Sequence, residues 1–200
     1  SRRQRQMCIR DSNGAGGVGS ILNQLAKWAG LEIYATSSPK NFEWLTSVGV
    51  DHPLDYHHDL KQSLQELGVE AVDYIAVLFD ITHYLEQITH LIKPFGHVGT
   101  IVGVNEPLNL SAWKNLSVSL DWEYMFAKTD YDYQIETQGE ALAMIASLAE
   151  RGVLKTTLTK VYSDGINAKN LRAATKEVES GHMLGKVVLS GTFNGEVAPF

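Results

Sequence analysis

The sequence predicts an α/β fold in which helices cover both faces of a parallel, doubly wound sheet. Three observations indicate this fold. A glycine cluster at residues 14–19 opens directly into an amphipathic helix. Apolar, strand-like runs then alternate with helices of about 10–15 residues, which is the pattern of crossover units that join parallel strands. The runs at residues 71–80 and 97–104 are almost continuously apolar, as in strands buried on both faces.

The expected elements follow one another along the chain, and most of the helices end at a glycine, which favours helix termination. Helices are expected at residues 20–30, 41–49, 58–68, 82–96, 134–151 and 167–181. Strands are expected at residues 31–38, 51–56, 71–80, 97–104, 117–126, 154–162 and 185–191. A first strand can come only from Met7–Ile9, because little else before the glycines is apolar. The predicted strand order is 3-2-1-4-5-6, and the strand, helix and strand after residue 153 form a smaller return unit.

Composition restricts the kind of protein. The chain has 200 residues, of which 44% are hydrophobic and 20% are charged, as in ordinary globular proteins. No apolar run approaches the ~20 residues that cross a bilayer, and no secretory signal is recognisable, so we expect a cytoplasmic protein without membrane attachment. Seventeen basic against 23 acidic residues argue against nucleic acid as a partner. The single cysteine, Cys8, excludes an internal disulfide within this sequence.

The glycines Gly14, Gly16 and Gly19 fit the pattern G-x-G-x-x-G. In a dinucleotide-binding Rossmann fold the first glycine permits a tight turn, the second lets the backbone approach a pyrophosphate, and the third lets the helix pack on the sheet. The helix N-terminus then offers free N–H groups to the phosphates. The pattern therefore predicts a dinucleotide site, and the alternative is a glycine turn that binds nothing.

The end of the second strand indicates which dinucleotide binds. An NAD site places Asp or Glu about 20 residues after the first glycine, where it holds the ribose hydroxyls. Here the window from Thr36 to Lys40 reads TSSPK and contains no acid. Ser37, Ser38 and Lys40 suit a 2′-phosphate, which favours NADPH. The alternative is that Lys40 is a solvated residue at a helix start.

Several stretches carry a family resemblance: NGAGGVGSILNQLAK, VSLDWEYMF, LKTTLT and NAKNLRAATKEVESGHMLGKVVLSG. Together they resemble the medium-chain dehydrogenase/reductase superfamily, in particular its zinc-type alcohol dehydrogenase-like and quinone oxidoreductase-like branch. The resemblance covers about residues 13–191. It implies a GroES-like catalytic half that this sequence lacks, and to which its last segment returns. Zinc is not supported by the residues present, because the zinc ligands of the family lie mainly in the missing half. We therefore assign no metal ligand, and the catalytic residues are left unassigned as well.

The resemblance also implies the residues that contact the cofactor. They belong to the glycine turn, to the ends of the second and third strands, and to the segments after the fourth and fifth strands. They are Gly16, Gly17, Val18, Ser37, Ser38, Lys40, Tyr56, Phe79, Asp80, Val102 and Gly103. Tyr56 could equally be a surface aromatic residue, and Phe79 could be a core residue.

The function implied by the resemblance is NADPH-dependent hydride transfer to a small-molecule carbonyl, enone or quinone. A non-catalytic dinucleotide-binding module is the alternative, and these 200 residues are expected to be inactive by themselves. The expected partner is a second copy, bound through the strand at residues 117–126, because an exposed apolar edge invites pairing. Its apolar alternation predicts that one face carries Val118, Leu120, Trp122, Tyr124 and Phe126.

Residues 1–12 differ in composition from the rest and hold Arg2, Arg3, Arg5 and Arg10. The string RRQRQMCIRDS resembles translated adapter sequence at the ends of chains assembled from environmental reads, and a solvated basic tail is the alternative. We therefore expect three parts: a non-native tail at 1–12, the NAD(P)-binding Rossmann domain at 13–130, and the last Rossmann helix with the return segment at 131–200.

Two further patterns favour other sites only weakly. Tyr124 and Lys128 match Y-x-x-x-K, and with Ser111 they resemble the catalytic set of short-chain dehydrogenases, but the tyrosine is predicted to lie on a strand rather than a helix. Adjacent His57 and His58 on a strand would point to opposite faces. Together with His83 and His90 they are therefore interpreted as surface residues rather than metal ligands.

Overall fold

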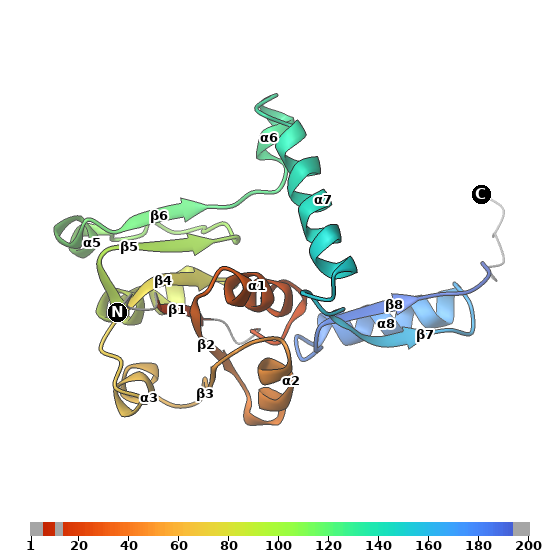
Figure 1. Cartoon of the computed structure of the whole chain (residues 1–200), viewed down its shortest axis with the longest axis horizontal. Coiled ribbons are helices and arrows are strands. Elements are labelled where there is room, and N and C mark those ends of the chain that lie inside the picture. Colours follow the sequence, from red (N-terminus) through yellow and green to blue (C-terminus); the bar gives the residue numbers. More distant parts are fainter. Residues whose placement is uncertain (1–5, 11–13, 194–200) are drawn as a thin grey trace.

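The computed structural model describes residues 6–10 and 14–193. Its centre is a parallel six-stranded sheet in the order β3-β2-β1-β4-β5-β6 (Figure 1). This confirms the predicted α/β fold and the order 3-2-1-4-5-6. The strands are β1 (Gln6–Arg10), β2 (Glu32–Ser37), β3 (His52–Asp55), β4 (Val72–Val77), β5 (Ile92–Thr100) and β6 (Ser119–Trp122).

The helices connect these strands, and a separate pair of strands follows them. The α-helices are α1 (Gly17–Trp28), α2 (Phe42–Ser47), α3 (Leu60–Glu66), α4 (Leu85–Leu91), α5 (Ser111–Leu116), α6 (Ala127–Asp130), α7 (Glu136–Glu150) and α8 (Ala168–Glu179). Two short 3₁₀ helices are η1 (Pro39–Asn41) and η2 (Ile81–Tyr84), and the parallel pair is β7 (Leu158–Tyr162) with β8 (Lys186–Leu189). No helix among the described residues is long and apolar enough to cross a membrane.

The first strand occupies the centre of the sheet. Its residue Ile9 pairs with Ala35 of β2 on one side and with Ala76 of β4 on the other. The strand predicted from Met7–Ile9 is therefore formed, one residue longer at each end. Its position means that the turn after it, which holds the glycines, lies at the carboxyl edge of the sheet between two neighbouring strands.

Two apolar cores lie on opposite faces of the sheet. Successive side chains of a strand point to opposite faces. Tyr34 therefore joins a core with Leu64 of α3 and Ile88 of α4, whereas its neighbour Ile33 joins a core with Leu45 of α2. Helices on both faces are what a doubly wound sheet requires.

Helix α1 buries Ala26 in the core, with Leu22 packed against it, but it also buries several polar residues that the sequence analysis did not predict to be buried. Its buried positions include Ser20, Asn23 and Gln24, whereas Trp28 is about half exposed. Each of these three side chains donates a hydrogen bond to a backbone carbonyl, whereas Asn23 Oδ1 accepts none. Asn23 Nδ2 donates to the carbonyl of Gly14 (3.1 Å), and Ser20 Oγ donates to the carbonyl of Ala15 (3.1 Å). The buried face of α1 thus holds the glycine turn in place.

Gln24 attaches the return unit to this helix. Its Nε2 donates to the carbonyl of Lys155 (3.2 Å), and its Oε1 accepts from the backbone N–H of the same residue (2.7 Å). Both backbone groups of one residue are therefore paired by a single amide side chain. Lys155 lies just before β7, so this contact fixes where the β7–α8–β8 unit leaves the main sheet (Figure 1).

One predicted boundary is wrong. The helix expected to run to Gly96 ends at Leu91, and β5 begins at Ile92 rather than at His97. Pro94 explains the early end, because a residue before proline is disfavoured in the helical conformation. The register of β5 against β4 then jumps between Ile92 and His97, so the intervening residues form an irregularity before regular pairing begins.

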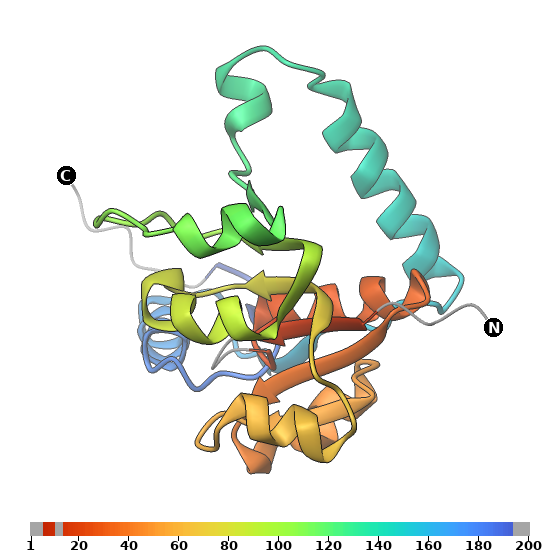
Figure 2. The same cartoon turned by 90° about the vertical axis from the view of Figure 1, so that its left-hand side faces the viewer.

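The strand expected at residues 117–126 is also shorter than expected. Strand β6 ends at Trp122, and a turn leads into α6, so Tyr124 lies beyond the strand rather than on it. Val118 and Leu120 pack against the core, whereas Trp122, Tyr124 and Phe126 are about half exposed. From here α6 and α7 extend away from the sheet as an arm (Figure 2). Helix α7 itself matches the helix expected at 134–151 within two residues at each end.

Replacing Gln24 with Ala tests its attachment role. We expect Gln24→Ala to lower the free energy of unfolding by about 1–2 kcal/mol, because two hydrogen bonds to the Lys155 backbone are lost. Limited proteolysis near residue 155 should become faster. Gln62→Ala is the control, because the amide of Gln62 is exposed and bonds only Glu66 of the same helix. Equal urea midpoints for the two variants would contradict the prediction.

Candidate functional site

The candidate site lies along the carboxyl ends of the strands, where doubly wound folds bind ligands. A first hollow of about 330 Å³ opens beside the ends of β2, β3 and β4. The return segment closes it from the other side. Its lining residues are Ala15, Ser38, Lys40, Asn41, Tyr56, Phe79, Ser180, Gly181, His182 and Met183.

A second hollow of about 220 Å³ continues from the first, because Gly181 and Met183 line both. It lies over the glycine turn and the start of α1. Its other lining residues are Gly16, Gly17, Val18, Gly19, Leu78, Ile101, Val178 and Lys186. The two hollows together form one cleft (hereafter the cleft) that runs from the end of β2 across the glycine turn toward the end of β5.

The start of α1 is open to a ligand. Gly16 is the N-cap residue just before the helix, no side chain caps the N-terminus, and no acid occurs in the first turn. The first N–H groups of an α-helix have no partner within the helix, and together with the helix dipole they favour a bound anion. This geometry fits a phosphate group held against Gly16 and Gly17.

The glycines allow close approach at this turn. A methyl group at Gly14 would lie 2.8 Å from the carbonyl oxygen of Thr36, which is backbone and has little freedom to move. A methyl group at Gly17 would lie 2.5 Å from both Cε and Nζ of Lys186. Gly14 therefore packs the turn on β2, and Gly17 leaves the space in which the Lys186 side chain lies.

Lys186 reaches the glycine turn because the three residues Leu184–Gly185–Lys186 form a tightly held turn (hereafter the LGK turn). Gly185 N–H donates to the carbonyl of Ala15 (2.9 Å), and Lys186 N–H donates to the carbonyl of Thr157 (2.7 Å). Gly185 has φ = 50°, and a side chain there would clash with the Thr157 carbonyl. Only glycine fits this position. The hydrogen bond from Gly185 to Ala15 then holds the LGK turn against the glycine turn.

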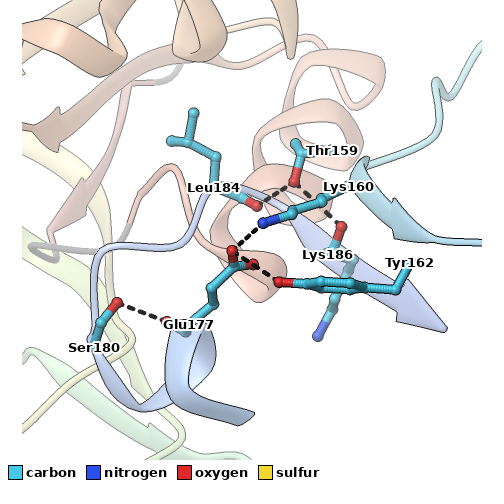
Figure 3. A network of polar contacts seen from close by, with 7 residues as sticks. All are labelled: Thr159, Lys160, Tyr162, Glu177, Ser180, Leu184 and Lys186. Atoms are coloured by element: carbon cyan, nitrogen blue, oxygen red, sulfur yellow. Dashed lines mark hydrogen bonds and ion pairs between the residues drawn. The ribbon is translucent and has the colours of Figure 1, made fainter. Parts of the chain in front are cut away.

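Side chains of β7 and α8 hold the LGK turn from behind (Figure 3). Thr159 Oγ1 donates to the carbonyl of Leu184 (2.7 Å) and lies 3.2 Å from that of Lys186. The Lys160 ammonium pairs with the Glu177 carboxylate, which also accepts from Tyr162 Oη (3.1 Å). The hydrogen bond to Glu177 raises the pKa of Lys160, and the same bond lowers the pKa of Glu177. The pair fastens α8 to β7.

The lining of the cleft contains lysines and no acidic residue. Lys40 lies at one end and Lys186 at the other. Among the described residues that line the two hollows, none is Asp or Glu. The electrostatics of the cleft therefore suit an extended anionic ligand with phosphates at both places.

The structure brings most of the predicted site residues to the cleft. Those that line it are Gly16, Gly17, Val18, Gly19, Ser38, Lys40, Tyr56 and Phe79. Gly14 lies behind the turn, and Val102 and Gly103 follow the end of β5, where their predecessor Ile101 lines the cleft. Ser37 is fully buried, and its Oγ accepts from Asn41 Nδ2 (2.9 Å). Asn41 is thus oriented by Ser37 and is the polar residue that lines the hollow.

Asp80 serves a local structural purpose in this structure. Its Oδ1 accepts from both the backbone N–H (2.9 Å) and the hydroxyl (2.7 Å) of Thr82 and so begins η2. These hydrogen bonds, the one from the hydroxyl first, lower the pKa of Asp80. Asp80 lines neither hollow.

Sequence reasoning missed the residues contributed by the return segment. Ser180, His182, Met183 and Lys186 line the cleft, although the sequence pattern assigns no cofactor role to them. The segment ESGHMLGK contributes to the sequence prediction only through the family resemblance. Its one local signal is a lysine directly after a glycine in an otherwise apolar run.

The four histidines considered as metal ligands (His57, His58, His83 and His90) and the Tyr-x-x-x-Lys pattern lie outside the cleft. His57 Nδ1 lies 2.6 Å from Asp55 Oδ1, and the backbone N–H of His57, hydrogen bonded to the same carboxylate, lowers the pKa of Asp55. Lys128 donates to Thr137, and the Tyr124 ring contacts that of Phe126. Tyr124 and Lys128 therefore have separate partners in this structure.

Comparisons with known proteins bear on this geometry. The family model described as zinc-binding dehydrogenase matches residues 48–189. The chain belongs to the zinc-binding dehydrogenase family. This places it in the medium-chain dehydrogenase/reductase superfamily, as the sequence resemblance predicts.

Individual members of the family show how far the likeness extends. A zinc-type alcohol dehydrogenase-like protein of Staphylococcus epidermidis is 37% identical over 180 residues, which cover 89% of this chain and 53% of that protein. A Rhizobium etli structure assigned to the zinc-dependent alcohol dehydrogenases superposes with a TM-score of 0.84 at 32% identity, covering 96% of this chain and 56% of the other. The NADPH-dependent alkenal/one oxidoreductase of Arabidopsis thaliana is 34% identical over 97 residues, which cover 48% of this chain and 23% of that protein. The chain thus spans about half the length of the first two relatives.

The family name implies zinc, but the described residues do not form a zinc site. Within residues 14–193, no three His, Cys, Asp or Glu side chains come together as ligands. A zinc site needs three or four such ligands around the metal.

Substituting Gly185 tests the LGK turn. We expect Gly185→Ala to lower the free energy of unfolding by about 2 kcal/mol or more, because it combines left-handed strain with a backbone clash. Gly181→Ala is the matched control: Gly181 also has a positive φ of 69°, but no atom lies within 4 Å of the added methyl group. Its cost should be about 1 kcal/mol. Guanidinium unfolding of both variants measures the difference, and equal losses would refute the steric argument.

Proposed function

We propose that the chain is the cofactor-binding half of an NADPH-dependent oxidoreductase that transfers hydride to a small-molecule carbonyl, enone or quinone. The observation that carries the proposal is the cleft, in which an open helix N-terminus and two lysines meet without a carboxylate. Family membership supports the reaction class. We also propose a cytoplasmic location, as expected from the composition of the sequence.

Each part of the cleft suits one part of the dinucleotide. Lys186 and the N–H groups at Gly16 and Gly17 would hold the pyrophosphate. Lys40, with Ser38 and Asn41, would hold the 2′-phosphate through charge-assisted hydrogen bonds. When bound, the dinucleotide supplies the hydride, and the protein supplies its orientation and electrostatic surroundings.

The two ends of the cleft complete the assignment. The rings of Tyr56 and Phe79 would flank the adenosine, and both are exposed in the first hollow. Val102 and Gly103 remain the residues proposed near the nicotinamide, beside Ile101. The name of the Arabidopsis relative supports both NADPH and an enone-type substrate.

A module that binds the dinucleotide without turning it over is the second candidate for the chain taken by itself. It is favoured by the glycine turn, which indicates dinucleotide binding and not a reaction. The two candidates share the cofactor site, so cofactor binding is the first property to measure. Reduction of an enone by the full-length protein, and none by this chain, would separate them.

Two lysine variants test the assignment of the phosphates. Lys40→Ala should weaken NADPH binding several-fold and leave NADH binding unchanged, because only the 2′-phosphate is lost as a partner. Lys186→Ala should weaken both dinucleotides by a similar factor, about fivefold, because both carry the pyrophosphate. Fluorescence titration of each variant with each dinucleotide measures this.

The outcomes separate the alternatives. Equal affinity of the unaltered protein for NADH and NADPH would overturn the cofactor assignment. Loss of NADPH preference in Lys186→Ala, with retention in Lys40→Ala, would show that the phosphate positions are exchanged. Lys61→Ala serves as the control for a general charge effect, because Lys61 is an exposed lysine on α3 that does not line the cleft.

We also propose that two copies associate through the edge at β6, as expected from the sequence. Trp122 at the end of the edge strand β6 and Tyr124 and Phe126 just beyond it are 49%, 57% and 52% exposed. An exposed edge strand with large apolar side chains favours pairing.

Sedimentation velocity at micromolar concentration tests the dimer. The unaltered protein should sediment as a dimer, and Trp122→Asp should shift it to monomer, because burying an unpaired charge in the interface is costly. Leu171→Asp is the control, since Leu171 on α8 is 58% exposed and does not belong to this edge. A monomeric unaltered protein would refute the proposal.

A further inference from the structure

His182 lines the first hollow of the cleft, beside the end of β2. It lines the first hollow together with Lys40 and Asn41, the residues proposed to hold the 2′-phosphate. It comes from the return segment, so it faces that end of β2 from the other wall. The cofactor contacts proposed for the cleft do not include it.

The hydrogen bond of its ring fixes what His182 can offer. His182 Nδ1 is bonded to the carbonyl of Ser180, and because a carbonyl oxygen only accepts, Nδ1 carries the hydrogen. In the neutral ring the other nitrogen, Nε2, is then a bare acceptor, which opposes an anion. Protonation converts Nε2 into a charged N–H donor. The ring therefore interacts favourably with a phosphate dianion only as imidazolium.

His182 belongs to a hydrogen-bonded turn at the end of α8. Ser180 Oγ donates to the carbonyl of Glu177 (2.6 Å), and the His182 N–H donates back to Ser180 Oγ (3.3 Å). Gly181, with φ = 69°, turns the chain at the end of α8. The ring is thus presented by a short, hydrogen-bonded turn rather than by an unsupported loop.

The charged groups around His182 favour an anionic ligand. From the elements across the hollow come Lys40 and Tyr56, and neither is an acid. Asp55 ends β3 and Asp80 comes after β4, but they are engaged by His57 and Thr82 and line neither hollow. The nearest acid along its own segment, Glu179, is exposed on α8 and also lies outside the lining.

We propose that His182 is a second ligand of the cofactor 2′-phosphate, opposite Lys40, and that it acts only in its protonated form. The proposal rests on the proposed NADPH function and adds a specificity-determining residue to it. Its consequence is that the preference for NADPH over NADH increases as the pH falls. Histidine is the side chain whose charge ordinarily changes between about pH 5 and 8.

The direction of the pH effect distinguishes protonation of His182 from protonation of the 2′-phosphate. A phosphomonoester loses its second proton near pH 6, so acidification alone reduces the charge on the 2′-phosphate and weakens NADPH binding. Protonation of His182 has the opposite effect. A preference that increases on acidification therefore reports the protein and not the ligand.

The test is the ratio of the dissociation constants of NADH and NADPH, measured with the whole chain at pH 6 and pH 8. We expect the ratio for the unaltered protein to be about fivefold higher at pH 6, the gain of one charge-assisted hydrogen bond. In His182→Gln the ratio should stay constant or fall by up to about twofold. The lysine in His182→Lys stays charged at both pH values. The ratio of the dissociation constants should therefore be high at pH 8 and show no further increase at pH 6.

Two controls exclude a general effect of pH. His90→Gln, on helix α4 and outside the cleft, should keep the pH dependence of the unaltered protein. Lys40→Ala should lower the ratio at both pH values and keep its increase on acidification. The same pH dependence in the unaltered protein and His182→Gln would overturn the inference while NADPH binding itself stands. Absence of dinucleotide binding would overturn both the inference and the proposed function.

Discussion

The carbonyl oxygen of Ala15 is the contact on which the rest of the site depends. It accepts from Ser20 Oγ of α1 (3.1 Å) and from the backbone N–H of Gly185 (2.9 Å). The first bond shapes the glycine turn, and the second attaches the end of the chain to it. Ser20 Oγ in turn accepts from the indole N–H of Trp44 (2.9 Å), so α2 joins the same group. The glycine turn, the segment that follows β2 and the LGK turn therefore keep a fixed arrangement.

Much of the fold could be predicted from the sequence, because it depends on local periodicity. The apolar run at 71–80 and the alternation with helices are properties of neighbouring residues, and the sheet order followed from them. The predicted helix end at Gly96 was wrong because two local signals, a proline and a glycine, indicated different ends. Pro94 acts on the residues before it, so the chain had already left the helix at Leu91, whereas the glycine indicated a later end.

The predicted half of the site is the half that is local in sequence. Gly16, Lys40 and Tyr56 follow strands in order, and parallel topology brings their ends to one edge. Lys186 and His182 reach the same edge only through contacts across the whole chain, among them Gly185 with Ala15 and Gln24 with Lys155. The polar face of α1 that makes such contacts was not predicted, because apolar residues at helical spacing suggested an apolar buried face instead. The sequence did contain one signal for this face: Ser20 and Asn23 are three residues apart and therefore lie on the same side of the helix.

The cleft also shows how an acidic protein can bind an anion. The net charge of −6 repels a polyphosphate at a distance. At an ionic strength of about 0.15 M that repulsion is screened beyond about 8 Å, so the local arrangement decides the interaction. None of the described residues that line the cleft is acidic, while Lys40 and Lys186 stand at its two ends. Excluding carboxylates is as important as adding lysines, because a carboxylate at the end of β2 would both repel a 2′-phosphate and hold the ribose hydroxyls of NADH. The distribution of charge, rather than its total, therefore sets which dinucleotide the cleft suits.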